Sequence, residues 1–435
     1  MGSYCELYIS NFPIATTKNE IDPFLLSIFQ PNDLVIFDRK IGDRFQLLYG
    51  REDSIDEQEI AIQYFNTAQN LKDRLNVIGF TMKKVEKEFE NTKRESLERL
   101  HEWIKDKSFS NNKNIEDTLK AEIELLRNSN LADFLSASKQ IIKNGFKIDK
   151  VNSAKPENTV VEYLMQDNYG LEKFPYGYDQ RTLLRALLEI TKPDEKITYD
   201  ITELVEGGYY ESDPENIYEE VIGNVTYDYK IGDKFLILTE GSSDIQILKN
   251  SLELLYPHLF GYYSFMDFGI SNASGSASSL VASVKSFVGA DIQNKIIALF
   301  DNDTAAESAI RGLSKTKITE NIKIIQYPNT KFLEDYPTMG PTGITKMNIN
   351  GLAGSIEMYL GTDTLTEKNK FIPVQWKGYD SVLKKYQGEI IDKLTVSKKF
   401  EERIKICKKN REKIKEFDWS GIDQILNIIF DAFNK

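Results

Sequence analysis

Acidic residues follow two short apolar runs of the sequence, at points where strands of a parallel sheet would end. The run Phe235–Leu238 leads into Glu240, and the run 295–300 leads into Asp301 and Asp303. Ligands of an open parallel sheet bind just outside the carboxyl ends of its strands, so we expect these carboxylates at one edge. Carboxylate oxygens suit Mg²⁺ or Mn²⁺ and suit zinc poorly. The pattern therefore indicates a magnesium or manganese centre.

Ordinary structural roles also fit these acids. Acids that follow strands often cap helices or occupy turns. Asp244, four residues after Glu240, suits the first turn of a helix because of the helix dipole. Glu357 could be a solvated surface acid, as a lone glutamate on a helix usually is. We favour the metal site because three acids converging at one edge of a sheet are uncommon by chance.

Elements of the right type surround these residues. Short apolar runs alternate with amphipathic stretches of about ten residues, a pattern that predicts βαβ units and a parallel sheet. We expect strands at 235–238, 262–268, 295–300 and 322–327, and helices at 244–256, 276–288 and 304–313.

Two of these segments, LTEGSSD and ALFDNDTA, resemble the two signatures of the Toprim domain, in the right order and in the expected strand context. That domain is shared by topoisomerases, bacterial primases, recombination mediators and the overcoming-lysogenization-defect (OLD) nucleases. The resemblance implies metal ligation by Glu240, Asp244, Asp301 and Asp303. GSIEMYL is similar to the OLD segment that supplies a further acidic ligand, which here would be Glu357.

A nuclease is the Toprim activity that fits this chain best. Primases and recombination mediators of this class carry cysteine-rich zinc modules, which two isolated cysteines cannot build. Topoisomerases need large additional domains. We therefore expect Glu240, Asp301 and Asp303 to catalyse phosphodiester hydrolysis in DNA or RNA. Two metal ions could act together, or Glu240 could act as general acid or base beside one metal.

OLD nucleases also use a lysine from a later segment, and both Lys377 and Lys393 are candidates for it here. The sequence contains no G-x-x-x-x-G-K-[ST] loop, so any coupled ATPase would be a separate protein.

The opening MGSYCELYISNFPI and the helices after it resemble the N-terminal domain that accompanies HEPN or Toprim effectors in bacterial proteins of suspected anti-phage defence. We expect this region to be α+β and mostly helical, with helical spacing from Asp56 and a loose stretch from residue 192 to 231. The predicted domains are an N-terminal HEPN/Toprim-associated domain (1–210), a linker (211–232), an α/β Toprim domain (233–362) and a helical C-terminal extension (363–435). Within the Toprim domain, residues 331–353 read as a loop.

Two rival functions remain open. The same acidic edge could belong to a non-catalytic scaffold that binds nucleic acid or a partner. Alternatively, Arg94 and His101 fit the R-x6-H spacing of HEPN ribonucleases, although a charged amphipathic helix gives the same pattern.

The composition limits the class of protein. The net charge of -12 argues against binding nucleic acid through a broad basic surface alone. No run approaches the roughly 18–20 apolar residues of a membrane helix, and the N-terminus does not resemble a signal peptide. We expect a cytoplasmic protein without membrane contact. Its expected partners are a nucleic-acid substrate, a separate ATPase or sensor protein, and further copies of itself.

Overall fold

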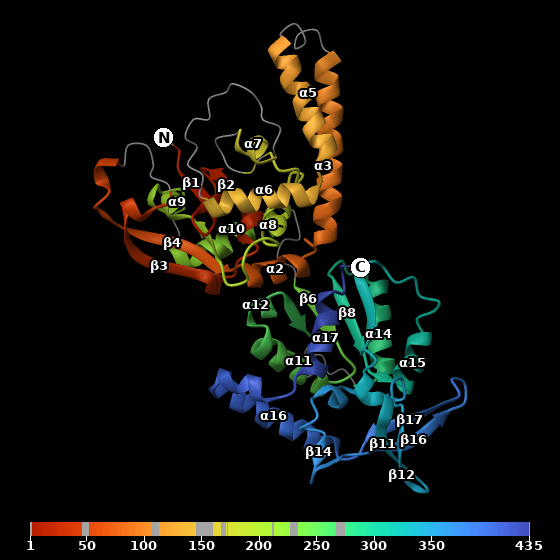
Figure 1. Ribbon diagram of the computed structural model, residues 1–435. Helices are drawn as coiled ribbons and strands as arrows, with labels where there is room; N and C mark the ends of the chain where they lie inside the picture. Colours follow the sequence, from red (N-terminus) through yellow and green to blue (C-terminus); the bar gives the residue numbers. More distant parts are fainter. Residues whose placement is uncertain are drawn as a thin grey trace. The chain divides into compact units, whose positions relative to one another are not determined.

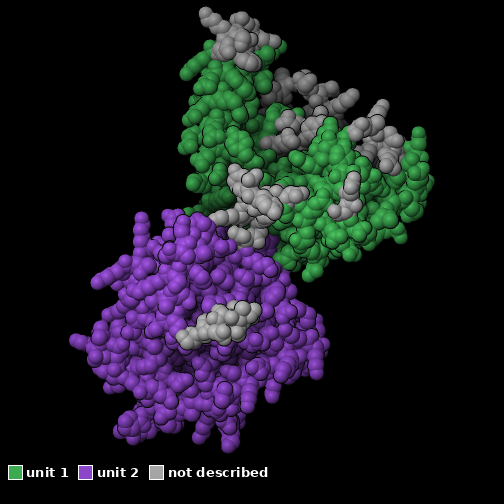
Figure 2. Space-filling view, turned by 180° about the vertical axis from the view of Figure 1, so that it is seen from behind, with its two compact units in different colours: residues 1–232 green, residues 233–435 purple. Residues whose placement is uncertain are grey.

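The computed structural model describes residues 2–45, 52–105, 113–144, 160–166, 171, 173–210, 213–226, 234–266 and 275–434. The chain divides into two compact units, residues 1–232 and 233–435 (Figure 2).

Unit 1 is built on a five-stranded antiparallel sheet with the strand order β2-β1-β5-β4-β3. Its strands are β1 (Tyr4–Ile9), β2 (Phe12–Lys18), β3 (Leu34–Lys40), β4 (Gln58–Thr67) and β5 (Lys196–Asp200). Its α-helices are α1 (Pro23–Leu26), α2 (Ala68–Val77), α3 (Met82–Lys105), α5 (Lys113–Asn128), α6 (Leu131–Asn144), α7 (Val160–Met165), α8 (Gln180–Leu187), α9 (Thr202–Glu206) and α10 (Ile217–Thr226). Short 3₁₀ turns are η1 (Pro31–Asp33), η2 (Ile41–Asp43), η3 (Glu52–Ser54) and η4 (Pro214–Asn216).

One face of this sheet packs against the helices. Tyr64 and Tyr199 from neighbouring strands share a core with Leu71 of α2 and Leu184 of α8. The long helices α3 and α5 lie side by side in the region where helical spacing is expected (Figure 1). The mixed α+β character of this unit is thus confirmed.

Two segments of unit 1 differ from the prediction. Residues 58–67, which we expected to be helical, form β4, because Ile62 and Tyr64 alternate with side chains of the opposite sheet face. Residues 196–200, within the expected loose stretch, form the central strand β5. Its neighbour β1 lies near the start of the chain, so this pairing joins two segments that are distant in sequence. Such a long-range pairing leaves no local pattern in five residues.

The segment expected to be a linker also contains structure. Helix α10 begins at Ile217, and Ile217 and Val221 are buried in the core of unit 1. The finer domain boundaries stay predictions.

Unit 2 contains the expected parallel sheet, with the strand order β10-β8-β6-β7. Its strands are β6 (Phe235–Leu238), β7 (Tyr263–Phe265), β8 (Ile296–Phe300) and β10 (Ile322–Gln326). The helices connecting them are α11 (Ser242–Leu255), α12 (Pro257–Phe260), α14 (Ala277–Gly289) and α15 (Thr304–Arg311). Helices α14 and α15 pack on Leu238, Ala298 and Phe300 of the sheet (Figure 1). The α/β prediction for this region is confirmed.

The prediction for the rest of unit 2 was partly wrong. Residues 331–353 are not simply a loop, and the C-terminal extension is not wholly helical. A second sheet of order β12-β11-β16-β17 consists of β11 (Tyr336–Gly340), β12 (Gly343–Met347), β16 (Val374–Asp380) and β17 (Lys385–Ile390). Every residue of β12 is exposed, so alternation of buried and exposed side chains could not reveal it.

Smaller elements complete unit 2. These are the pairs β9 (Asn302–Asp303) with β13 (Ala353–Gly354) and β14 (Thr366–Glu367) with β15 (Lys370–Phe371), the turns η5 (Lys331–Asp335), η6 (Ile356–Tyr359) and η7 (Arg411–Glu416), and the helices α16 (Lys393–Lys409) and α17 (Ser420–Phe430). In the part of the chain that the structure describes, no helix has the length and apolarity needed to cross a membrane.

Candidate functional site

The carboxyl ends of three neighbouring strands place Glu240, Asp301 and Tyr327 at one edge of the parallel sheet. These residues follow β6, β8 and β10, which are adjacent in the sheet. A carboxylate oxygen of Glu240 accepts a hydrogen bond from the backbone N–H of Asp301 at 3.0 Å. The backbone at Gly275 passes close by, and a Cβ there would lie 3.1 Å from the carbonyl oxygen of Glu240. The edge predicted from sequence is therefore formed.

Asp244 and Glu357 join this edge from other elements. Asp244 is the third residue of α11 and is buried, and the hydroxyl of Ser243 donates to its Oδ1 at 3.4 Å. Glu357 lies in a 3₁₀ turn, not an α-helix, and its side chain is fully buried. Its Oε2 accepts a hydrogen bond from the hydroxyl of Ser355 at 2.8 Å.

Lys393, and not Lys377, lies at this site. The Nζ of Lys393, the first residue of α16, is 3.3 Å from Oε2 of Glu357. Asp301 and Asp244 also act electrostatically on Lys393. Lys377, on β16, instead forms a long contact of 3.9 Å with Glu389, and both side chains are about half exposed. The structure thus selects Lys393 from the two candidate lysines, between which the sequence could not decide.

Three buried polar atoms at the site have no hydrogen-bond partner among the residues that the structure describes. They are Oδ1 of Asp301, Oε1 of Glu357 and the hydroxyl of Tyr327. A buried polar atom left unpaired costs about 1–3 kcal/mol, so most are satisfied in folded proteins. Three unpaired atoms in one cluster indicate a place that a ligand could complete.

The acids at the site repel one another. Burial, together with the charges of Asp303 and Asp244, raises the pKa of Glu240 to about 7. Burial and the nearby Glu357 raise the pKa of Asp244 to about 7. Burial and the charges of Asp244, Glu240 and Asp303 hold the pKa of Asp301 well above its usual range. Burial lowers the pKa of Lys393, but the surrounding carboxylates outweigh it and the net pKa is raised. One lysine thus faces several carboxylates in a poorly solvated place.

Asp303 is held differently from the other acids. Its Oδ1 accepts a hydrogen bond from the backbone N–H of Ala306 at 2.7 Å, which caps α15, and its Oδ2 accepts one from Nε2 of Gln387 at 2.7 Å. Both oxygens are therefore engaged, so Asp303 is less available to a ligand than Asp301. Its metal-binding and catalytic roles stay predictions.

The acidic side chains do not close around an ion as they stand. Among the described residues, no three His, Cys, Asp or Glu side chains converge closely enough to hold a metal ion. Mutual repulsion among the carboxylates and the presence of Lys393 both favour such an open arrangement.

Comparison with known proteins bears on the other unit. Residues 1–224, more than half of the chain, match the family described as HEPN/Toprim N-terminal domain 1. The chain belongs to this family. The prediction of an N-terminal HEPN/Toprim-associated domain is thereby confirmed, and the family suggests a nuclease-like or nucleic-acid-related role. No curated protein and no solved structure matches the chain.

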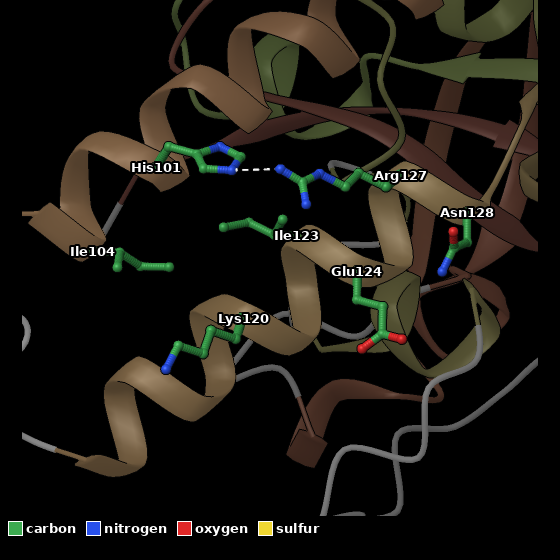
Figure 3. A pocket seen from close by; sticks show the side chains of 7 residues that line it. All are labelled: His101, Ile104, Lys120, Ile123, Glu124, Arg127 and Asn128. Carbon is green, nitrogen blue, oxygen red and sulfur yellow. Dashed lines mark hydrogen bonds between the residues drawn. The ribbon is translucent and has the colours of Figure 1, made fainter.

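The HEPN/Toprim N-terminal domain contains His101, the candidate residue of the rival ribonuclease hypothesis. His101 lines a cleft of about 500 Å³ between α3 and α5 (Figure 3). Its Nδ1 contacts the carbonyl oxygen of Leu97, and its Nε2 accepts a hydrogen bond from Nη2 of Arg127 at 2.8 Å. Arg94 instead contacts Asn91 on its own helix. The structure thus pairs His101 with Arg127, and both ring nitrogens have partners.

Sequence reasoning missed Tyr327 at the other unit's acidic edge. The predicted strand 322–327 includes Tyr327 as its last residue, whereas the observed strand β10 ends one residue earlier and leaves Tyr327 just beyond the strand end, where ligands bind. No local signal could have chosen Lys393 over Lys377, because only the return of α16 to the edge of the sheet distinguishes them.

Proposed function

We propose that unit 2 is a Toprim-type nuclease domain, similar to those of OLD nucleases, that hydrolyses phosphodiester bonds of DNA or RNA with the help of Mg²⁺ or Mn²⁺. The observation that carries this proposal is the cluster of Glu240, Asp244, Asp301 and Glu357 around Lys393, with two unpaired buried carboxylate oxygens. A cluster with a purely structural role would destabilise the folded state through repulsion and unpaired polar atoms, and no other interaction would offset that loss.

The donor set fits a hard divalent cation. All five proposed ligands (Glu240, Asp244, Asp301, Asp303 and Glu357) offer carboxylate oxygens, and Oδ1 of Asp301 and Oε1 of Glu357 are unpaired in the described part of the chain. Such oxygens suit Mg²⁺ and Mn²⁺. A cation would require the carboxylates to move closer together, and it would remove the repulsion that contributes to the raised pKa values of Glu240, Asp244 and Asp301.

Each residue has a role that follows from its place. A divalent cation bound here would stabilise charge on a phosphoryl group and make water a better nucleophile. Lys393 would place a positive charge beside the phosphate as negative charge develops on it. Glu240, at the end of β6 and beside the backbone N–H of Asp301, would accept a proton from the attacking water. The hydroxyl of Tyr327 would donate a hydrogen bond to the bound phosphate.

The biological setting is proposed from resemblance. We infer that the protein is an effector of bacterial anti-phage defence and that a separate sensor or ATPase controls it. Phage plating on bacteria that express the wild type or Asp301→Asn tests this part. Equal plating on both strains would rule out a defence role for the acidic site.

The biochemical experiment is cleavage of labelled plasmid DNA and total cellular RNA in Mn²⁺, Mg²⁺ or EDTA. Wild type is compared with Glu240→Ala and His101→Ala. Metal-dependent cutting that only Glu240→Ala removes supports the proposal and identifies the substrate class. Metal binding without turnover on either substrate would favour a non-catalytic scaffold.

A second candidate function places catalysis at His101, because that residue lines a cleft together with Arg127. In that case His101→Ala and Arg127→Ala abolish RNA cleavage, Glu240→Ala retains it, and EDTA has no effect. This is the weaker candidate, because both ring nitrogens of His101 already have partners and neither is free to exchange a proton with a substrate.

A further inference from the structure

A groove of about 320 Å³ lies between α11 and α16 in unit 2, and it begins next to the acidic site. Ser243 lines it from α11 and also donates the hydrogen bond to Asp244. Ser397 lines it from α16, one helical turn after Lys393 on the same helix face. Each wall of the groove thus starts within one turn of a residue of the site.

The lining combines an apolar floor with polar walls. Ile247, Phe400 and Ile404 are buried and form the floor. Gln246 and Asn250 present side-chain amides on the α11 side. Amides both donate and accept hydrogen bonds, as do the edges of nucleobases.

The far end of the groove is closed. Lys408 of α16 reaches α11, where its Nζ donates to Oδ1 of Asn250 at 3.1 Å and forms an ion pair with Glu253 at 2.5 Å. Lys405 adds a further positive charge at the rim, which Glu401 partly offsets. The volume of the groove and this polar bridge at one end suit one compact group.

We propose that this groove binds a single unpaired nucleotide next to the phosphate that is cleaved, so the substrate is single-stranded or locally unpaired nucleic acid. This inference rests on the proposed nuclease function and adds its substrate class. A base in the groove would lie on Ile247 and Phe400, with its edge near Gln246, and its phosphate would face Asp244 and Lys393.

Size favours this occupant over an intact duplex. The volume lies at the lower end of the roughly 300–1,000 Å³ of small-molecule sites, which suits one nucleotide. A base of a duplex must first be unpaired and unstacked, at a cost in free energy, before it can enter such a groove. The two lysines add little net charge to the groove, because Lys408 pairs with Glu253 and Glu401 offsets Lys405.

Photo-crosslinking and binding test the inference with the full chain. A short DNA strand carrying 4-thiothymidine is irradiated with the protein in EDTA and in Ca²⁺, as a single strand and as a duplex, and crosslinked peptides are identified by mass spectrometry. We expect crosslinks within 243–250 and 397–408 from the single strand. We also expect the single strand to bind at least about tenfold more tightly than the duplex, because the duplex must pay for unstacking.

Ser397→Trp fills the groove, and Lys398→Trp is its matched control on the neighbouring, exposed position outside the groove. We expect Ser397→Trp to weaken single-strand binding about tenfold or more and to remove the crosslinks. Lys398→Trp should retain the crosslinks, although it loses a positive charge. Gln246→Leu, which keeps the size of the side chain but not its amide, should weaken binding without affecting folding.

The outcomes separate this inference from the nuclease proposal. Crosslinks in the groove without cleavage in Mn²⁺ would support the groove and contradict hydrolysis. A second outcome is metal-dependent cleavage in which single strand and duplex bind equally and Ser397→Trp does not weaken binding. This outcome would overturn the groove assignment but would still support the nuclease proposal. Absence of nucleic-acid crosslinks from the groove would also overturn it and would indicate another occupant, such as a peptide.

Discussion

Nζ of Lys393 lies 3.3 Å from Oε2 of the fully buried Glu357, and the other oxygen of that carboxylate has no partner among the described residues. The two side chains come from a 3₁₀ turn and from the first residue of α16, and they meet beside Asp301 and Asp244. This ion pair brings the later part of unit 2 to the carboxyl edge of the parallel sheet.

Lys393→Met should reduce metal-dependent cleavage by about 10²-fold, as loss of one preorganised group that stabilises transition-state charge does. Lys377→Met, the matched control, should retain the wild-type rate, because Lys377 is half exposed and contacts only Glu389. Single-turnover rates on a labelled strand measure the difference.

Lys393→Met also leaves the buried Glu357 carboxylate without its counter-ion, which should lower the free energy of unfolding by about 3 kcal/mol. Lys393→Arg therefore serves as the second variant, because it keeps the charge and the fold. Equal cleavage by Lys377→Met and Lys393→Met, with both proteins folded, would exclude a role for Lys393.

Tyr327→Phe should reduce cleavage about tenfold or more while leaving stability unchanged or slightly raised. The hydroxyl of Tyr327 is buried without a partner in the described part of the chain, so the folded protein gains nothing from it. Tyr64→Phe removes a similarly unpaired hydroxyl in unit 1 and should not change the cleavage rate. A Tyr327→Phe protein as active as the wild type would show that this hydroxyl has no function.

Stability of the metal-free protein should fall as pH rises from about 4 to 7. Glu240 and Asp244 have ordinary pKa values of 4.5 and 3.8, and both are raised to about 7 in the folded state. The folded state therefore binds more protons than the unfolded state in this window, so the free energy of unfolding decreases with pH. Mg²⁺ should restore stability above pH 7, because it binds the deprotonated folded form.

Scanning calorimetry in EDTA and in Mg²⁺ measures this slope. Glu240→Gln combined with Asp244→Asn should flatten it and remove the stabilisation by Mg²⁺. An unchanged slope in that double variant would show that the pH dependence arises elsewhere, for instance at Glu6, whose pKa burial raises to about 7 in unit 1.

Sequence patterns reveal the parts of this structure that depend on local chemistry. The buried strands β6 and β8 are continuous apolar runs, so their ends, and with them Glu240 and Asp301, were predictable. Helices α3 and α5 were predictable from their apolar spacing.

Other parts depend on contacts between distant segments. β5 is identified by its partners β1 and β4, and the exposed strand β12 lacks any burial pattern. The apolar positions Ile60, Tyr64 and Phe65 of β4 also fit helical spacing, which explains the error there. Lys393 enters the site only because α16 folds back to the sheet edge.

Asp301→Asn gives the most direct test of the central claim, with Asp335→Asn as a matched control at an exposed acid of the same unit. Cleavage in Mn²⁺ and thermal unfolding in EDTA are measured on the same protein samples. We predict that Asp301→Asn loses at least about 10²-fold of the cleavage rate. We also predict that its unfolding midpoint rises by roughly 2–4 °C, because about 1 kcal/mol of carboxylate repulsion is relieved. Asp335→Asn should match the wild type in both measurements. Undiminished metal-dependent cleavage by Asp301→Asn would contradict the assignment of the acidic edge as the catalytic site.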